Sequence, residues 1–199
     1  MSNQRAAQLK KITEELQNLK ESPLYEYRQK NNYSVVVGEG NHQANLMFIG
    51  EAPGEKEAKS GRPFVGAAGR ILDELLESIR LKREDVYITN IVKDRPPDNR
   101  DPTVEEIQLY QPFLIKQIEI IQPKVIATLG RFAMEFVMGQ FNMAEKGQKI
   151  SALHGKALTA QTSAGPISVV PLYHPAVALY VRERKETLKS DFQVLKEVL

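Results

Sequence analysis

The sequence predicts one α/β domain over residues 1–199, a three-layer α/β/α sandwich around a central four-stranded parallel sheet. Three observations support this fold class. Short apolar runs, typical of buried strands, alternate with longer stretches whose apolar residues recur at helical spacing. Strands joined through helices form parallel sheets that are covered on both faces. No internal repeat, low-complexity tract or linker divides the chain.

Each expected strand is a short run of β-branched and other apolar residues. The central strands are expected at 46–49, 86–91, 124–129 and 167–170, and an edge strand at 34–37. The stretch from 148 to 171 is expected to add one or two peripheral strands. The central strands are separated by predicted helices, which is why we expect them to run parallel.

The expected helices are amphipathic. One covers 5–21 and a second covers 67–80. A third begins at Asp101-Pro102-Thr103 and runs to about Ile121, and Pro112 is expected to bend or break it. A short helix follows Gly130 and ends near Gly139. The last helix is expected to bury one apolar face: Leu188, Phe192, Leu195 and Val198.

Composition limits the classes of function. The chain has no cysteine, which excludes disulfides, thiolate metal sites and cysteine nucleophiles. No apolar run approaches the roughly 18 residues that span a membrane, and the N-terminus lacks a signal-peptide core, so we expect a cytoplasmic protein without a membrane partner. A net charge of +2 is too small to indicate a nucleic-acid partner by itself.

The first loop with candidate chemistry is 50–69, GEAPGEKEAKSGRPFVGAAG, directly after an expected strand. Glycine and proline force a sharp turn, which places Glu51 at the end of the sheet. Glu51 is either part of an acidic surface turn or a functional carboxylate. Phe64 either plugs this rigid loop onto the sheet or offers a flat face for a stacked base. Arg62 in the same loop is a candidate for DNA contact.

The second such loop is 90–100, NIVKDRPPDNR. The Asn90 amide either caps the following turn or reads a base edge, because an amide donates one hydrogen bond and accepts another. That pattern matches the O4 acceptor and N3–H donor of uracil, and cytosine presents the reverse pattern. Lys93, Arg95 and Arg100 are candidates for phosphate contact, although the interspersed aspartates are typical of a solvated loop.

Two further segments carry candidate residues. The Gly130-Arg131 turn could hold a phosphate at a helix start, a weak pattern that many α/β units share. His174 is the histidine with a clear position, after the last core strand and before Pro175, where it could face an anionic leaving group. Leu179 and Tyr180, followed by Arg182 and Arg184, suit a wedge that enters a duplex while the arginines hold phosphates, or simply the start of an amphipathic helix.

Four motifs occur in order across most of residues 34–180: GEAPGEKE with GRPFVGAAG, VYITNIVK with RPPDNR, PKVIATLG, and YHPA. Together they resemble the family 4 uracil-DNA glycosylases. The resemblance implies an α/β/α fold and hydrolysis of the bond between uracil and deoxyribose, which leaves an abasic site. It also implies uracil-containing DNA, single- or double-stranded, as the partner of a protein that we expect to be monomeric.

The resemblance assigns roles to individual residues. It implies that Phe64 stacks on the flipped uracil, that Asn90 reads its edge and that His174 bonds to O2. It also implies that Glu57 crowds C5 and rejects the methyl group of thymine. Better-known uracil glycosylases carry an aspartate that orients water at the position of Ala52. Glu51 is therefore the candidate to position water or to stabilise the sugar cation.

The chain departs from this family in one respect. The family carries an iron–sulfur cluster on four cysteines, which fall near Leu19 and Ser22, at Asp94 and at Tyr110 in this chain. We therefore expect no cluster and no metal. Leu19 and Tyr110 are expected to fill the space by packing, and Ser22 and Asp94 to form hydrogen bonds.

Two alternative functions remain open. One is a glycosylase of shifted specificity that acts on hypoxanthine or another deaminated base, or that traps its product covalently. Covalent trapping is disfavoured, because relatives that do so carry an arginine-rich insertion ending in histidine, and the DRPPDNRD loop has no histidine. The other alternative is a non-catalytic DNA- or base-binding homologue, which the intact Glu51, Phe64, Asn90 and His174 disfavour.

Overall fold

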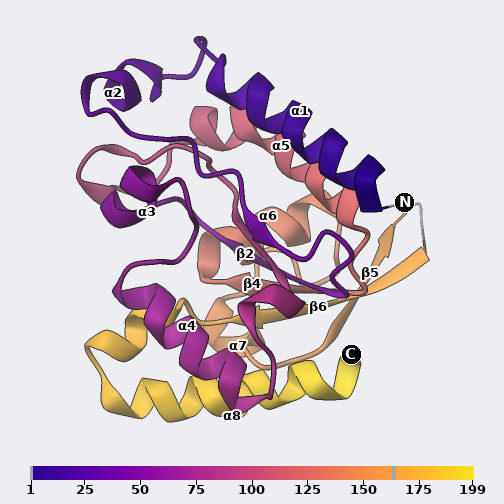
Figure 1. Ribbon diagram of the computed structural model, residues 1–199. Helices are drawn as coiled ribbons and strands as arrows, with labels where there is room; N and C mark the ends of the chain where they lie inside the picture. The colour runs from indigo at the N-terminus through magenta and orange to yellow at the C-terminus, as the bar shows by residue number, and fades with distance from the viewer. Residues whose placement is uncertain (1, 163–164) are drawn as a thin grey trace.

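The computed structural model describes residues 2–162 and 165–199, and its core is a six-stranded sheet in the order β1-β3-β2-β4-β6-β5 (Figure 1). The strands are β1 (Glu39–Gly40), β2 (Leu46–Gly50), β3 (Tyr87–Asn90), β4 (Val125–Leu129), β5 (Leu158–Thr162) and β6 (Gly165–Leu172). The neighbouring pairs among β3, β2, β4 and β6 are parallel, which confirms the predicted central sheet. Antiparallel strands β1 and β5 extend the sheet at its two edges.

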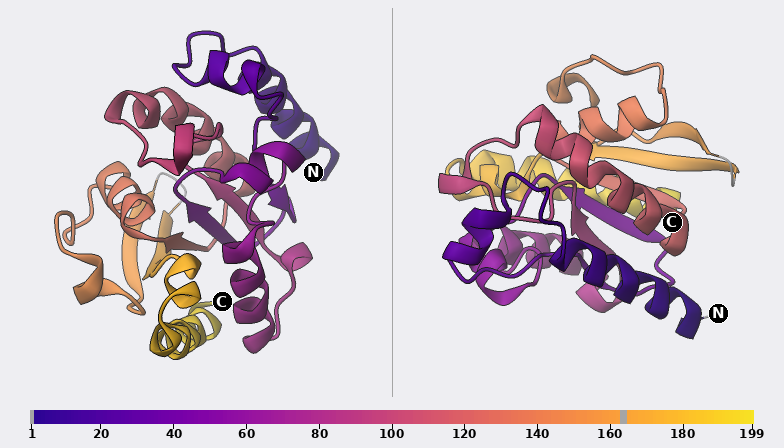
Figure 2. Two further views of the ribbon diagram at one scale, coloured as in Figure 1. Left: turned by 90° about the vertical axis from the view of Figure 1, so that its left-hand side faces the viewer. Right: turned by 90° about the horizontal axis from the view of Figure 1, so that it is seen from above.

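Helices cover both faces of this sheet (Figures 1 and 2). One core packs beneath α1 (Ser2–Gln17), α5 (Val104–Ile121), α6 (Arg131–Gln140) and the short α7 (Ile150–Leu153). The other lies between the sheet, α4 (Ala67–Ser78) and α8 (Arg182–Val198). The three-layer α/β/α prediction is therefore confirmed. None of the helices in the described part of the chain is long and apolar enough to cross a membrane.

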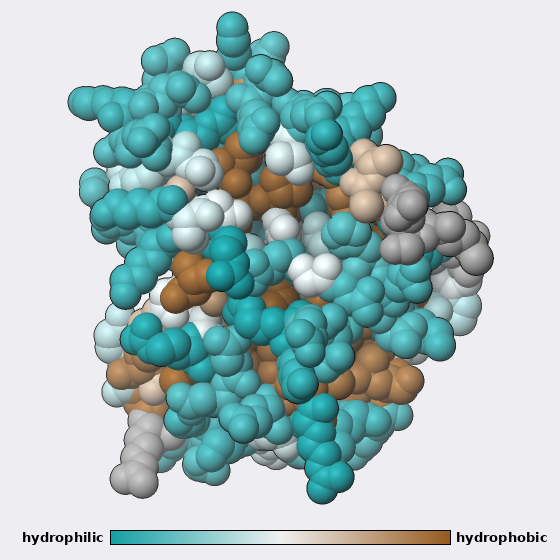
Figure 3. All heavy atoms as spheres, in the orientation of Figure 1, coloured by the Kyte–Doolittle hydropathy of each residue, from teal (hydrophilic) through white to brown (hydrophobic). Residues whose placement is uncertain are grey.

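Short helices complete the loops. They are α2 (Tyr25–Lys30), α3 (Glu55–Ser60) and the 3₁₀ turns η1 (Arg83–Asp85), η2 (Pro97–Asn99) and η3 (Pro175–Leu179). Each of these elements is too short to show a period in the sequence, so none was predicted. The face of the molecule in Figure 3 is largely hydrophilic, with only scattered apolar side chains between the charged ones.

One local prediction was wrong, and a second was wrong in part. Residues 34–37 form no strand; the Val36 amide bonds instead to the Lys93 carbonyl at 2.8 Å, so their β-branched character reflects burial rather than pairing. Pro112 was expected to bend or break α5, and the break is absent, because the helix continues to Ile121. This helix keeps its predicted start, where Thr103 and Glu106 form a capping box. Buried Tyr110 and Leu114 on either side of Pro112 hold the helix against the core.

Candidate active site

The carboxyl ends of β2, β3 and β6 open into one cleft of about 480 Å³. This is the edge at which open parallel sheets bind their ligands. Five residues singled out from the sequence line this cleft: Glu51, Glu57, Phe64, Asn90 and His174. They come from three separate stretches of the chain, 50–69, the end of β3 and the segment after β6, and the parallel strands bring them together.

Asn90 ends β3 at the floor of the cleft. Its side chain is buried, and its Oδ1 has no hydrogen-bond partner among the described residues. Gly50 lies directly beside it, because a Cβ on Gly50 would come within 2.3 Å of Asn90 Oδ1 and 2.7 Å of Phe64 Cζ. A buried acceptor without a partner is costly, so Asn90 is suited to a ligand that donates a hydrogen bond at this point.

Phe64 forms an apolar wall of the cleft. Its ring centroid lies 5.7 Å from that of His174, with the two planes tilted by 31°. The backbone of Phe64 is left-handed, with φ of 50°, which a residue with a bulky side chain rarely adopts. The surrounding structure must therefore hold this conformation.

Glu57 lies in α3 and supports the same wall. One of its oxygens, Oε1, accepts hydrogen bonds from the backbone amides of Val65 at 2.9 Å and Gly66 at 2.7 Å. Gly66 is the residue before α4, so Glu57 caps this helix from a distance. These bonds fix the carboxylate at the edge of the cleft.

His174 follows β6 and offers a neutral donor. Its Nδ1 accepts a hydrogen bond from the Ala176 amide at 3.2 Å, so the ring proton is assigned to Nε2. Desolvation lowers the pKa of His174 to about 4, although the charge of Glu57 opposes this shift. At neutral pH the imidazole is therefore uncharged and donates from Nε2.

Glu51 supplies the carboxylate of the cleft. Burial raises the pKa of Glu51 to about 7, the nearby charge of Asp101 adds to the rise, and Arg131 opposes it. A carboxyl group with a pKa near the working pH is suited to general acid–base chemistry. Glu51 is also tied to the segment that follows β3, because its carbonyl accepts from the Val92 amide at 3.0 Å.

Three arginines considered for DNA contact are engaged with other side chains. Arg62 pairs with Glu39 at 2.7 Å and Arg131 pairs with Asp101 at 2.7 Å. Arg95 donates to the Tyr33 hydroxyl at 2.8 Å. None of the three lines the cleft, although all three lie close to its loops in the sequence.

The end of η3 and the residue that follows it carry two exposed side chains. Leu179 is 43% exposed and its neighbour Tyr180 is 86% exposed. Tyr180, which the sequence places with Leu179 at the candidate wedge, lines the cleft. The side chain of Arg182 lies outside the described residues.

Lys93 cannot contact phosphate, and that prediction was wrong. Its side chain is fully buried, and Nζ donates to the Asn90 carbonyl at 2.6 Å, to Gln117 Oε1 at 2.6 Å and to Thr89 Oγ1 at 2.7 Å. Burial lowers the pKa of Lys93 well below its ordinary value. Lys93 supports the end of β3 from beneath. Arg100 does line the cleft, paired with Glu106.

The positions of the family's cysteines hold a hydrogen-bonded group. Ser22 Oγ and the Tyr110 hydroxyl lie 2.7 Å apart, and that hydroxyl donates to Asp94 Oδ2 at 2.6 Å. Arg28 bonds to both oxygens of Asp94, at 3.0 and 3.1 Å. Leu19 packs against the core as expected, but Tyr110 forms hydrogen bonds in addition to packing.

This group does not fit an iron–sulfur cluster. Its side chains contain no thiolate, and the buried phenol of Tyr110 occupies the interior between them. Nor do the described residues contain a cluster of three or more histidine, aspartate or glutamate side chains that could hold a metal ion.

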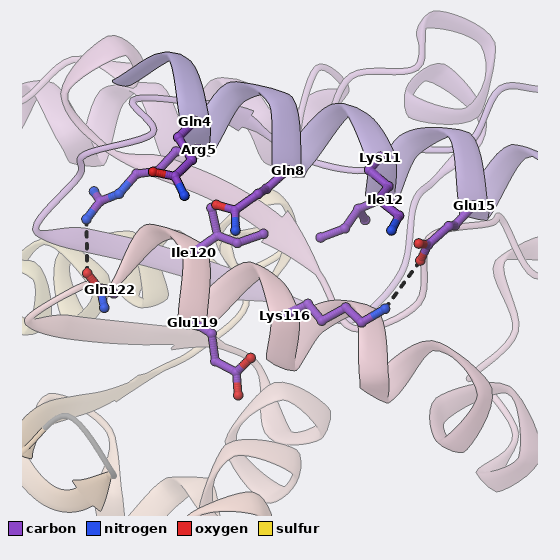
Figure 4. Close-up of a pocket in the computed structure, with 10 residues that line it drawn as sticks. All are labelled: Gln4, Arg5, Gln8, Lys11, Ile12, Glu15, Lys116, Glu119, Ile120 and Gln122. Atoms are coloured by element: carbon purple, nitrogen blue, oxygen red, sulfur yellow. Dashed lines mark hydrogen bonds and ion pairs between the residues drawn. The ribbon is translucent and has the colours of Figure 1, made fainter. Parts of the chain in front are cut away.

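A second hollow lies between α1 and α5 and measures about 620 Å³ (Figure 4). Paired side chains cross it at both ends, with Arg5 donating to Gln122 at 3.0 Å and Lys116 lying 3.3 Å from Glu15. None of the strand-end residues borders it. We interpret it as the open seam of a helix pair rather than as a site.

The chain is similar to known proteins over most of its length. The profile described as "Uracil DNA glycosylase superfamily" matches residues 37–196. The type-4 uracil-DNA glycosylase of Archaeoglobus fulgidus is 45% identical over 172 residues, which are 86% of this chain and 84% of that protein. That of Sulfurisphaera tokodaii is 44% identical over 191 residues, covering 96% of this chain and 84% of its own. That of Thermotoga maritima is 43% identical over 171 residues, 85% of each chain. With a cleft that joins Glu51, Phe64, Asn90 and His174, and with this similarity along most of its length, the chain belongs to the uracil-DNA glycosylase superfamily, beside its type-4 members.

Proposed function

We propose that this protein is a monofunctional uracil-DNA glycosylase, which hydrolyses the bond between uracil and deoxyribose and leaves an abasic site for base excision repair. The observation that carries the proposal is the buried Asn90 Oδ1, which has no partner among the described residues and faces Phe64 across Gly50. The type-4 relatives, named as uracil-DNA glycosylases, support the same function.

Base recognition follows from the chemistry of the amide. Asn90 Oδ1 accepts from uracil N3–H and its amide nitrogen donates to O4, while the ring of Phe64 stacks on the base. Cytosine presents an acceptor at N3, so it would leave Oδ1 unpaired in a buried site. Glu57 is held rigidly by two backbone amides, and we assign to it the exclusion of the thymine methyl group.

In the reaction, the C1′–N1 bond breaks and its electron pair leaves with uracil, while the sugar becomes oxocarbenium-like. The neutral His174 donates from Nε2 to uracil O2, where negative charge develops. Ionised Glu51 stabilises the sugar cation or orients the water whose oxygen bonds to C1′. The proton released by that water balances the charge on the departing uracil.

We also propose that the protein binds DNA at the mouth of this cleft. We assign the apolar tip at Leu179 and Tyr180 to the entry point beside the flipped base, because both side chains are exposed and Tyr180 lines the cleft. Arg62, Arg95, Arg131 and Arg182 remain candidates for phosphate contact. Action on single- or double-stranded DNA, the monomeric state and the cytoplasmic location also stay predictions.

We further propose that the enzyme works without the iron–sulfur cluster of its family. The buried Ser22–Tyr110–Asp94 group supports this, because it occupies the positions of the cluster ligands with hydrogen-bonded side chains. Iron analysis and a visible spectrum of purified protein test the point. Bound iron with absorbance near that of iron–sulfur proteins would refute it.

One experiment tests the function. Labelled single-stranded and duplex oligonucleotides that carry uracil, thymine or hypoxanthine are incubated with the protein, treated with alkali and separated on a denaturing gel. We expect cleavage at uracil alone and no band shifted by covalent attachment. Asn90→Ala should abolish cleavage, whereas Asn18→Ala, on the exposed surface of α1's C-terminal turn, should not. Cleavage at hypoxanthine, a covalent band or no cleavage at all would each favour an alternative function.

A further inference from the structure

The main chain of residues 63–66, which carries the stacking ring, is held from two sides. On one side, Glu57 accepts from the Val65 and Gly66 amides. On the other, Arg83 donates from Nη2 to the Pro63 carbonyl at 2.6 Å and from Nη1 to the Phe64 carbonyl at 3.0 Å. Two side chains therefore satisfy four backbone groups around a residue whose φ is 50°.

Arg83 lies in η1, and α4 separates it from Phe64 in the sequence. The remaining N–H groups of Arg83 donate hydrogen bonds to two carboxylates. Glu39 Oε1 accepts from Nη2 at 2.6 Å and from Nε at 3.1 Å, and Asp73 accepts from Nη1 at 3.0 Å. All five N–H groups of the guanidinium are thereby used, and its position is determined by partners from β1 and α4.

The start of α4 also packs closely against the backbone of Phe64. A Cβ on Gly69 would lie 1.8 Å from the Phe64 carbonyl oxygen, so the first turn of this helix rests directly on the peptide that Arg83 binds. Only a residue without a side chain permits this approach. The backbone of Phe64 is therefore clamped by Arg83, Glu57 and the helix start.

We propose that Arg83 is a positioning residue of the base site, which holds Phe64 in its left-handed conformation and thereby directs the ring toward His174. The proposal rests on the proposed function, because it assigns the ring to base stacking. Lysine could replace Arg83 only in part, because a single ammonium group cannot reach both carbonyls and both carboxylates in the geometry of a planar fork. Arg83 does not touch the base; it acts through Phe64.

The test compares Arg83→Met and Arg83→Lys with the control Arg80→Met. Arg80 is exposed just after α4, three residues before Arg83, and forms no side-chain bond within the described residues. The fold should tolerate Arg83→Met, because Glu39 keeps Arg62 as a partner. We expect Arg83→Met to lower kcat/KM on a uracil oligonucleotide roughly 10-fold to 100-fold, since small misplacements of a binding group cost about this much. Arg83→Lys should be intermediate and Arg80→Met unchanged.

A double-mutant cycle separates positioning from a general structural role. If Arg83 acts through Phe64, Arg83→Met should cause little further loss of kcat/KM in a Phe64→Ala background. Losses that multiply would overturn the proposal, because Arg83 would then act independently of the ring.

Hydrogen exchange of the 61–66 peptide gives a readout that does not depend on activity. Exchange of the Val65 and Gly66 amides should accelerate in Arg83→Met and stay unchanged in Arg80→Met. Unchanged exchange in Arg83→Met would refute the clamp even if the enzyme cleaves uracil DNA. The wild-type protein could also fail to cleave such DNA and to bind free uracil, while exchange is still faster in Arg83→Met. That result would support the clamp but refute both its role in base stacking and the proposed function.

Discussion

The hydroxyl of Tyr110 donates a hydrogen bond of 2.6 Å to Asp94 Oδ2 in the interior, where both side chains are at most 1% exposed. This bond joins α5 to the loop that follows β3. Arg28 extends the connection, because it bonds to Asp94 and also to the carbonyls of Leu16 and Gln17 at the end of α1. The loop anchored in this way continues to Pro96 and Asn99, which line the cleft.

Removing the hydroxyl group of Tyr110 should destabilise the protein. Tyr110→Phe leaves Ser22 Oγ without this partner and takes one donor from Asp94, so we expect the free energy of unfolding to fall by about 1–3 kcal/mol. Asp94→Ala leaves the buried Arg28 without its counter-charge and should cost about 3–5 kcal/mol. Urea denaturation measures both values. Tyr180→Phe, at an 86% exposed position, is the control, and a Tyr110→Phe protein as stable as this control would contradict the structural role.

A methyl group at Gly50 should block the cleft. Gly50→Ala places a Cβ 2.3 Å from Asn90 Oδ1, so the amide or the ring of Phe64 must move. We expect activity on uracil DNA to fall by about 100-fold or more, because displacements of this kind cost about 100-fold. Gly139→Ala is the matched control, since the nearest atom to its new methyl group is 4.0 Å away. Equal rates for the two variants, with both proteins folded by circular dichroism, would remove Gly50 from the site.

The two nitrogens of His174 can be separated by substitution. Nδ1 caps the Ala176 amide, and Nε2 is left to donate to the base. His174→Asn keeps a side chain that can cap this turn but does not reach the base, so stability should be retained while turnover falls by about two to three orders of magnitude. His174→Ala should lower both the stability and the turnover. Single-turnover cleavage and thermal melting measure the two effects, and an unchanged cleavage rate in either variant would exclude His174 from the mechanism.

Much of the site could be predicted because the chemistry of a parallel sheet lies at the carboxyl ends of its strands. Glu51, Asn90 and His174 each follow an apolar run directly, so their meeting in one cleft follows from the fold class. The four central strands could be predicted for a related reason, since buried parallel strands are continuously apolar.

The remaining features depend on tertiary contacts that no local pattern encodes. Val36 and Val37 have the composition of a strand, but the chain there bonds to the Lys93 carbonyl. Lys93 itself lies in a charged loop yet is buried by Gln117 and Thr89. Arg83 gains its role only because Glu39 and Asp73 converge on it from β1 and α4. Sequence spacing does not reveal which charged side chains fold inward.

The pH dependence of the reaction should report Glu51. Its pKa is raised to about 7, so the carboxyl group is protonated below that pH and ionised above it. If the ionised form acts, single-turnover rates should rise with pH through about 7 and level off above it. His174, with a pKa lowered to about 4, should add no change in this range. Glu51→Gln should remove the pH-dependent limb and lower the rate.

The charge next to Glu51 offers a sharper version of this test. The negative charge of Asp101 raises the pKa of Glu51, and Arg131 lowers it. Asp101→Asn removes the first influence and frees Arg131 from its ion pair, so both changes favour the ionised carboxylate. The acid limb should therefore move to lower pH in Asp101→Asn and to higher pH in Arg131→Gln. Opposite shifts of one limb in these two variants would assign it to Glu51, whereas a limb that stays in place in both would assign it to another group.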